Sequence, residues 1–158
     1  MKTTVTQMEK ESACSSRDVF FPEGIIGFSK HKRYQVLINK SQEPFLWLES
    51  KEDPKLCFVI IDPKEFYPEY SPVLTEIDRI ALGVDCVDGC QFFTIVVIPE
   101  DSSKISANLL APVVINKKDN IGRQVVLQEQ GYSVQHLILE DMLKRLGDKN
   151  VSSFTQTE

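Results

Sequence analysis

The chain is built from short apolar runs that are too brief to be buried helices. Two examples are residues 57–61, which stop before Asp62 and Pro63, and residues 92–98, which stop at Pro99. Runs of about four to eight residues, rich in Val, Ile and Phe and bounded by Pro, Gly, Asn or Asp, are typical of β-strands. Several of these runs have no polar face. Both faces of their sheet must therefore be covered, as in a closed or strongly curled antiparallel barrel.

Two other segments have helical spacing. In the first, Leu74, Ile77 and Ala81 are expected to share one face, with Thr75 as the N-cap and Gly83 as the stop. The second is apolar at Leu139, Met142, Leu143 and Leu146, acidic in its first turn and basic in its last. The sequence predicts a mainly β fold: a small antiparallel β-barrel-like domain with one or two short helices, including a C-terminal amphipathic helix.

The domain organisation follows from where periodicity begins and ends. The chain has 158 residues, which suits one domain. Residues 1–17 are polar and aperiodic, so we expect a flexible N-terminal arm or a partial first strand. Residues 18–147 are predicted to form the β-barrel domain with its C-terminal helix, and residues 148–158 a polar tail.

The charge of the chain limits its partners. The formal net charge is -5 and the pI is about 5.1. An acidic surface repels phosphate, which disfavours direct nucleic-acid binding and favours a basic or neutral partner. The first residues lack the apolar core of a signal peptide, and no apolar run approaches the ~20 residues of a membrane span. The expectation is a cytoplasmic protein without a membrane partner.

Catalytic motifs are not apparent. The seven glycines form no phosphate-binding loop, and the two histidines, His31 and His136, leave few groups for acid–base chemistry. Cys86 and Cys90 have the wrong spacing for a zinc pair. We therefore expect no cofactor, no metal site and no enzymatic activity. The alternative is a carbohydrate-active or other small enzyme on a β-barrel, which would need two convergent carboxylates in a polar pocket.

Two segments could bind other proteins. Residues 108–112 place adjacent leucines and a proline between two strands, which indicates either an apolar binding lip beside an open edge or a buried bend. Residues 62–70 hold three aromatics and two prolines, the composition of a rigid protein-binding loop, although Phe66 could equally pack in the core.

Five stretches of the chain also resemble a known family. They are the Phe-Pro-Glu-Gly element at residues 21–28, the Pro-Phe-Leu-Trp-Leu element at 44–50, and residues 53–63, 107–116 and 122–127. The Asn-Leu-Leu-Ala-Pro element from Asn108 to Pro112, followed by Ile115 and Asn116, is the most specific. Together, and in this order, they resemble FliW, the bacterial flagellar assembly factors. The resemblance covers about residues 19–138.

The resemblance implies a small antiparallel β-barrel-like fold and two protein partners. These are flagellin and CsrA, an RNA-binding translational repressor: FliW proteins freed when flagellin is exported bind CsrA, which then releases flagellin mRNA. An acidic protein suits a basic RNA-binding partner. The expected state is a monomer.

Candidate binding residues combine the two partners that the resemblance implies with the two segments described above and with the charge of the chain. Acidic side chains can disfavour RNA near CsrA, and apolar ones can line or support a groove for flagellin helices. The acidic candidates are Glu65, Glu69, Asp85 and Asp88, and the others are Phe45, Trp47, Phe66, Asn108, Leu109, Leu110 and Pro112.

Overall fold

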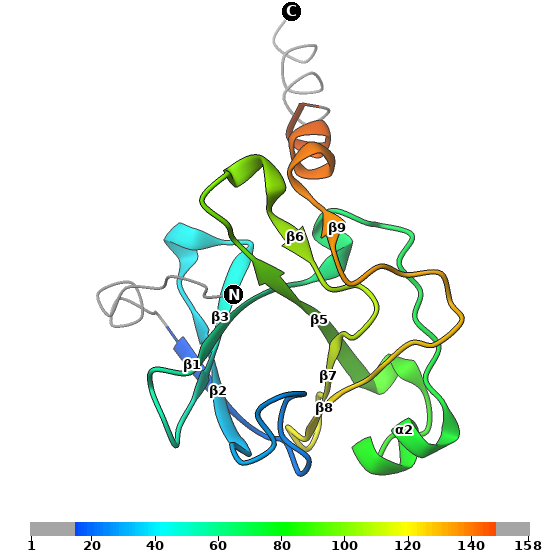
Figure 1. The fold of residues 1–158 in the computed structure, drawn as a ribbon. Helices are drawn as coiled ribbons and strands as arrows, with labels where there is room; N and C mark the ends of the chain where they lie inside the picture. Colours follow the sequence, from blue (N-terminus) through cyan, green and yellow to red (C-terminus); the bar gives the residue numbers. More distant parts are fainter. Residues whose placement is uncertain (1–14, 148–158) are drawn as a thin grey trace, which may run out of the picture.

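A strongly curled antiparallel sheet of nine strands forms the body of the protein in a computed structural model that describes residues 15–147 (Figure 1). The strands are β1 (Ser15–Phe20), β2 (Arg33–Ile38), β3 (Phe45–Ser50), β4 (Cys57–Ile61), β5 (Cys90–Val97), β6 (Ser106–Ala107), β7 (Val113–Asn116), β8 (Gly122–Gln124) and β9 (His136–Leu137). The helices are α2 (Glu76–Leu82), residues 139–147, and the 3-10 turns η1 (Lys40–Gln42), η2 (Pro63–Glu65), η3 (Val87–Gly89) and η4 (Ser102–Lys104).

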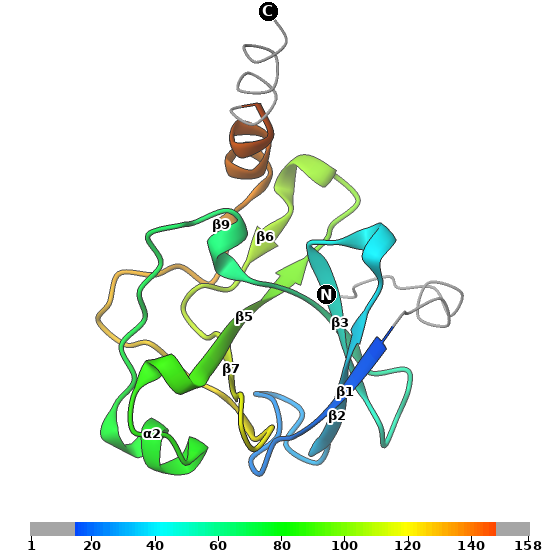
Figure 2. The same ribbon diagram turned by 180° about the vertical axis from the view of Figure 1, so that it is seen from behind.

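The long strand β5 is the branch point of the sheet. Its second half pairs with β4 on one side and β6 on the other, and its first half pairs with β7. Strands β1 to β5, β7 and β8 thus curl into a ring, visible from both sides in Figures 1 and 2. A single bridge between Phe20 and Ile121 joins β1 to the start of β8, so no continuous ladder closes the ring. The predicted mainly β, barrel-like fold with a C-terminal helix is confirmed, as a curled sheet rather than a closed barrel.

Both faces of the central strands, such as β4 and β7, are largely buried, which explains their continuous apolar runs. Successive residues of β4 point in opposite directions, as strand geometry requires. Ile60 packs inside the ring with Tyr34 and Leu48, whereas Val59 and Ile61 pack in a second core outside it. An apolar run of this kind therefore contributes alternate side chains to the two cores.

Long connections cover the outer core. Residues 62–74 contribute Phe66, Tyr70 and Leu74, and residues 125–142 contribute Leu127 and Ile138. Both connections run along the same side of the sheet in Figures 1 and 2. The outer core thus depends on loops rather than on a second sheet.

The first strand begins earlier than residue 18. β1 starts at Ser15 and pairs in register with β2, from Ser15 opposite Ile38 to Phe20 opposite Arg33. The end of the predicted arm is therefore strand, one of the two interpretations of the sequence. The rest of the arm and the predicted tail at 148–158 lie outside the described residues.

A tyrosine inside the ring gives stability a dependence on alkaline pH. Tyr34 is fully buried, and its hydroxyl has no hydrogen-bond partner among the described residues. Burial, with a smaller contribution from the charge of Glu52, raises the pKa of Tyr34 to about 12 from an ordinary value of 10.0. The folded state therefore keeps this proton longer than the unfolded state does. The resulting stability is complete below pH 10 and is lost as pH rises through about 12.

We expect Tyr34→Phe to remove this pH dependence. At neutral pH the free energy of unfolding should change by less than about 1 kcal/mol, since the lost hydroxyl is unpaired. As pH rises from 10 to about 12, the free energy of unfolding should fall in both proteins. The fall should be smaller in the variant, by on the order of 2 kcal/mol. Urea unfolding followed by fluorescence of Trp47 measures both. Identical alkaline profiles would contradict the assignment.

Candidate protein-binding surfaces

Helix α2 is held at both ends by its own sequence. The Thr75 hydroxyl accepts a hydrogen bond from the backbone N–H of Asp78 at 3.1 Å, and the Asp78 carboxylate accepts from the Thr75 backbone N–H at 3.3 Å. Gly83 ends the helix with a φ of 73°, the left-handed region in which a glycine is not strained. The predicted cap and stop are both confirmed.

The face that α2 buries differs from the predicted one. Leu74 is buried, but Ala81 is exposed and Ile77 is 72% exposed. The inward side chains are Asp78, which is 8% exposed, and Leu82. The expected apolar face of Leu74, Ile77 and Ala81 is therefore wrong, because a buried carboxylate determines which side of the helix turns inward.

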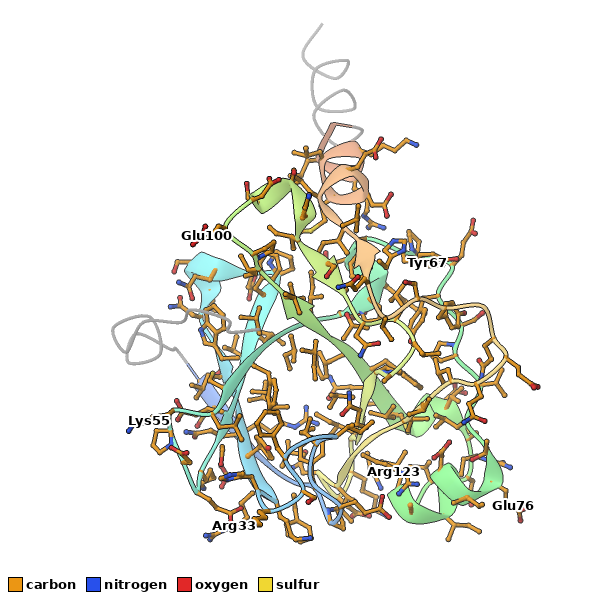
Figure 3. All side chains as sticks on the ribbon, viewed as in Figure 1. Arg33, Lys55, Tyr67, Glu76, Glu100 and Arg123 are labelled. Carbon is orange, nitrogen blue, oxygen red and sulfur yellow. The ribbon has the colours of Figure 1, made fainter. Side chains whose placement is uncertain are left out.

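Asp78 is buried because Arg123 of β8 meets it. The Arg123 Nε donates to Asp78 Oδ1 at 3.0 Å, and its Nη1 donates to Glu23 Oε2 at 2.6 Å. The two carboxylates raise the pKa of Arg123 despite its partial burial, which by itself lowers it. Figure 3 shows Arg123 beside α2 and Glu76 projecting from the helix. The ion pair fixes the orientation of α2 on the sheet.

Exposed carboxylates flank α2 in the sequence. Asp85 and Asp88 follow the helix and Glu69 precedes it, and all three are exposed. Neither these three nor Glu76 forms an ion pair within residues 15–147. Arg79, the one basic residue of the helix, donates from Nη1 to the backbone oxygen of Asp85 at 3.1 Å. Two of the predicted acidic candidates, Asp85 and Asp88, thus lie in the exposed segment that directly follows α2.

The aromatic loop at 62–70 is mainly part of the core. Phe66 and Tyr70 are buried, and the Tyr70 hydroxyl donates to the backbone oxygen of Leu109 at 2.7 Å. Burial, and then the neighbouring Tyr132, raises the pKa of Tyr70. Only Glu65 and Glu69 of the candidates in this loop reach solvent. The core alternative is therefore confirmed for Phe66.

His136 completes this aromatic cluster. Its ring stacks on Phe66 at a centroid distance of 5.7 Å and meets Tyr67 edge-on at 5.5 Å. Its Nε2 lies 3.0 Å from Asp141 Oδ2, next to the C-terminal helix. This environment matches a structural histidine that ties β9 to the loop and the helix.

The segment from Asn108 to Pro112 is a bend with its side chains turned inward. Leu109 and Pro112 are buried and Leu110 is half-buried. The Asn108 Oδ1 accepts from the backbone N–H of Ala111 at 3.0 Å, which holds the bend. The buried-bend alternative describes this segment.

The remaining apolar candidates, Phe45 and Trp47, are two residues apart on β3 and share one face of the strand. Phe45 is half-buried and Trp47 is 7% exposed, and both pack in the outer core. Trp47 is therefore too buried to contact a partner directly, whereas part of Phe45 is accessible.

A hollow of about 480 Å³ opens between the ends of the strands. Its walls include Val36, Leu46 and Phe93, and three acidic residues, Glu43, Asp62 and Glu65, also line it. All three acidic residues are exposed to water.

The cysteines do not form a metal site in the part of the chain that is described. Residues 15–147 contain no group of three His, Cys, Asp or Glu side chains placed to hold a metal ion. Cys86 is exposed, whereas Cys90 is buried, and burial raises the pKa of the Cys90 thiol. None of the helices described is long and apolar enough to span a bilayer.

These features define a class: a curled antiparallel β-sheet protein with two cores and several exposed carboxylates. Comparison with known proteins specifies the family. The family model described as FliW protein matches residues 2–138. A FliW from Caldanaerobacter subterraneus is 38% identical over 125 residues, which are 78% of this chain and 83% of that protein. One from Leptospira interrogans is 34% identical over 128 residues, covering 80% of this chain and 85% of that protein.

A solved structure agrees with these sequence matches. The crystal structure of a flagellar assembly factor FliW superposes with a TM-score of 0.72 at 30% identity, over 77% of this chain and 84% of that one. The chain belongs to the FliW family.

We expect Asp78→Ala to destabilise the protein by about 2–3 kcal/mol. The change leaves Arg123 without its better-buried partner and removes the carboxylate that caps α2. Urea unfolding followed by Trp47 fluorescence measures the loss. Glu76→Ala, two positions earlier and exposed, is the matched control and should leave the unfolding midpoint nearly unchanged. Equal midpoints for the two variants would show that the ion pair does not hold α2.

Proposed function

We propose that this chain is a cytoplasmic flagellar assembly factor that works by binding two proteins in turn. It holds flagellin as a chaperone-like partner. When flagellin is scarce it binds CsrA instead, which relieves repression of flagellin mRNA. The observation that carries the proposal is the match to relatives named flagellar assembly factor FliW over about four-fifths of the chain.

The charge of the surface supports the part of the proposal that concerns CsrA. An RNA-binding protein presents Lys and Arg to phosphate, so its surface complements an acidic one. Glu65, Glu69, Asp85 and Asp88 are exposed and form no ion pairs within residues 15–147. Their carboxylates are free to attract a basic protein and to repel the RNA that it carries.

The apolar candidates support the part that concerns flagellin less directly. Leu110 and Phe45 are half-buried and can contact a partner with their outer atoms. Leu109, Trp47 and Pro112 are buried and can only shape such a surface from beneath. We assign Phe45 and Leu110 to contact, and the buried residues together with Phe66 and Asn108 to support.

A competition experiment with purified proteins tests the partner switch. The chain should bind CsrA and flagellin separately, and flagellin should release CsrA from a preformed complex in isothermal titration or size-exclusion chromatography. Affinity for CsrA should fall at least tenfold between about 0.05 M and about 0.5 M salt, because exposed charges are screened. Binding to neither protein, or a stable ternary complex, would refute the switch.

A charge variant tests how much of the affinity for CsrA comes from electrostatic attraction and how much from other contacts. The variant replaces the four carboxylates by their amides: Glu65→Gln, Glu69→Gln, Asp85→Asn and Asp88→Asn. It should bind CsrA more weakly at low salt, and its affinity for CsrA should depend less on salt. Glu100→Gln, at an exposed acid on the opposite side of the molecule from Glu76 of α2 (Figure 3), is the control that should leave CsrA binding unchanged.

A further inference from the structure

Helix α2 carries an exposed apolar stripe that the fold does not use. Val73 is 66% exposed, and Ile77 and Ile80 are each 72% exposed. Their spacings of four and three residues place the two isoleucines on one side of the helix, with Val73 just before its first turn. We call these three residues the α2 stripe. Adjacent branched side chains with this much exposure are a feature of interaction sites.

The stripe cannot turn inward. The opposite side of α2 is occupied by Leu82, which is fully buried, and by Asp78, which is paired with Arg123. Asn116 of β7 adds a hydrogen bond from Nδ2 to the backbone oxygen of Leu82 at 2.8 Å. Rotating the helix to hide Ile77 would break this ion pair and this hydrogen bond. The exposure is therefore built into the fold.

The segment that carries the stripe is acidic, and we call its exposed carboxylates the acidic rim. Residues 69–88 contain five carboxylates and one basic side chain, Arg79. Asp78 is paired with Arg123. The other four carboxylates are exposed and form no ion pair within the described residues: Glu69, Glu76, Asp85 and Asp88. An apolar surface with a rim of one sign selects a partner with apolar side chains flanked by the opposite charge.

We propose that the α2 stripe docks a segment of the basic RNA-binding repressor, one that presents apolar side chains flanked by Lys or Arg. This rests on the proposed function, which supplies a basic partner. A second copy of this chain fits less well, because two stripes face to face would bring eight like-charged carboxylates together. The isoleucines supply contact area, and the rim supplies orientation and rapid association.

The test is Ile77→Ser combined with Ile80→Ser, measured for binding to CsrA. Both side chains point to solvent, so the variant should fold, with an unchanged circular dichroism spectrum. Its Kd for CsrA should rise about tenfold or more, as expected when apolar anchors are truncated. Its affinity for flagellin should stay within about twofold, because the stripe is separate from the residues assigned to flagellin.

Leu143→Ser combined with Leu146→Ser is the matched control. These leucines are 57% and 53% exposed on the C-terminal helix, at the far end of the molecule from α2 (Figures 1 and 2). CsrA binding should be unchanged in this variant. An equal loss in both double variants would overturn the inference, because it would reflect lost apolar surface in general.

Three further outcomes would also overturn it. If the parent binds CsrA and the Ile77/Ile80 variant binds equally well, the stripe is not the docking face and the proposed function stands. If the parent binds neither CsrA nor flagellin, both the inference and the proposed function fail. If the parent is a dimer in size-exclusion chromatography and the variant a monomer, the stripe is a self-interface.

Discussion

The ion pair between Asp78 and Arg123 determines which side of α2 faces solvent. It joins α2 to β8, and through Glu23 it also joins the turn after β1, so three segments distant in sequence meet at one guanidinium. A carboxylate leaves water only when a partner compensates its charge, and a broken pair would leave an uncompensated charge in the interior. Because Asp78 must face inward, Ile77 and Ile80 must face outward.

The strands and caps could be predicted from local sequence, but the orientation of α2 could not. The apolar runs and turn residues indicate a curled sheet because strand geometry is local, and Thr75 and Gly83 mark α2 for the same reason. The partner of Asp78 lies 45 residues away. Counting apolar residues therefore favours the wrong face, since it assumes that the inward side of a helix is apolar.

The candidate binding residues also fall into two groups, those whose exposure could be predicted from the sequence and those whose exposure could not. Exposure of Glu65, Glu69, Asp85 and Asp88 follows from charge, because an unpaired carboxylate stays in water. For Leu109 and Pro112, apolar character fits both a core and an interface, and only the three-dimensional arrangement separates them. That Ile77 and Ile80 are exposed together was not predicted from the sequence. A signal for it existed, because Asp78 lies between them: the helix can turn inward either the side with the isoleucines or the side with the acid.

Hydrogen–deuterium exchange of the chain with and without CsrA is the most direct measurement of the central claim, that α2 and its acidic rim form a protein-docking face. Binding should slow amide exchange in residues 76–88, while the interior strand β4 changes little because it is already protected. Added flagellin should reverse the effect as CsrA is released. Slowed exchange confined to residues outside 69–88 in a saturated CsrA complex would contradict the account.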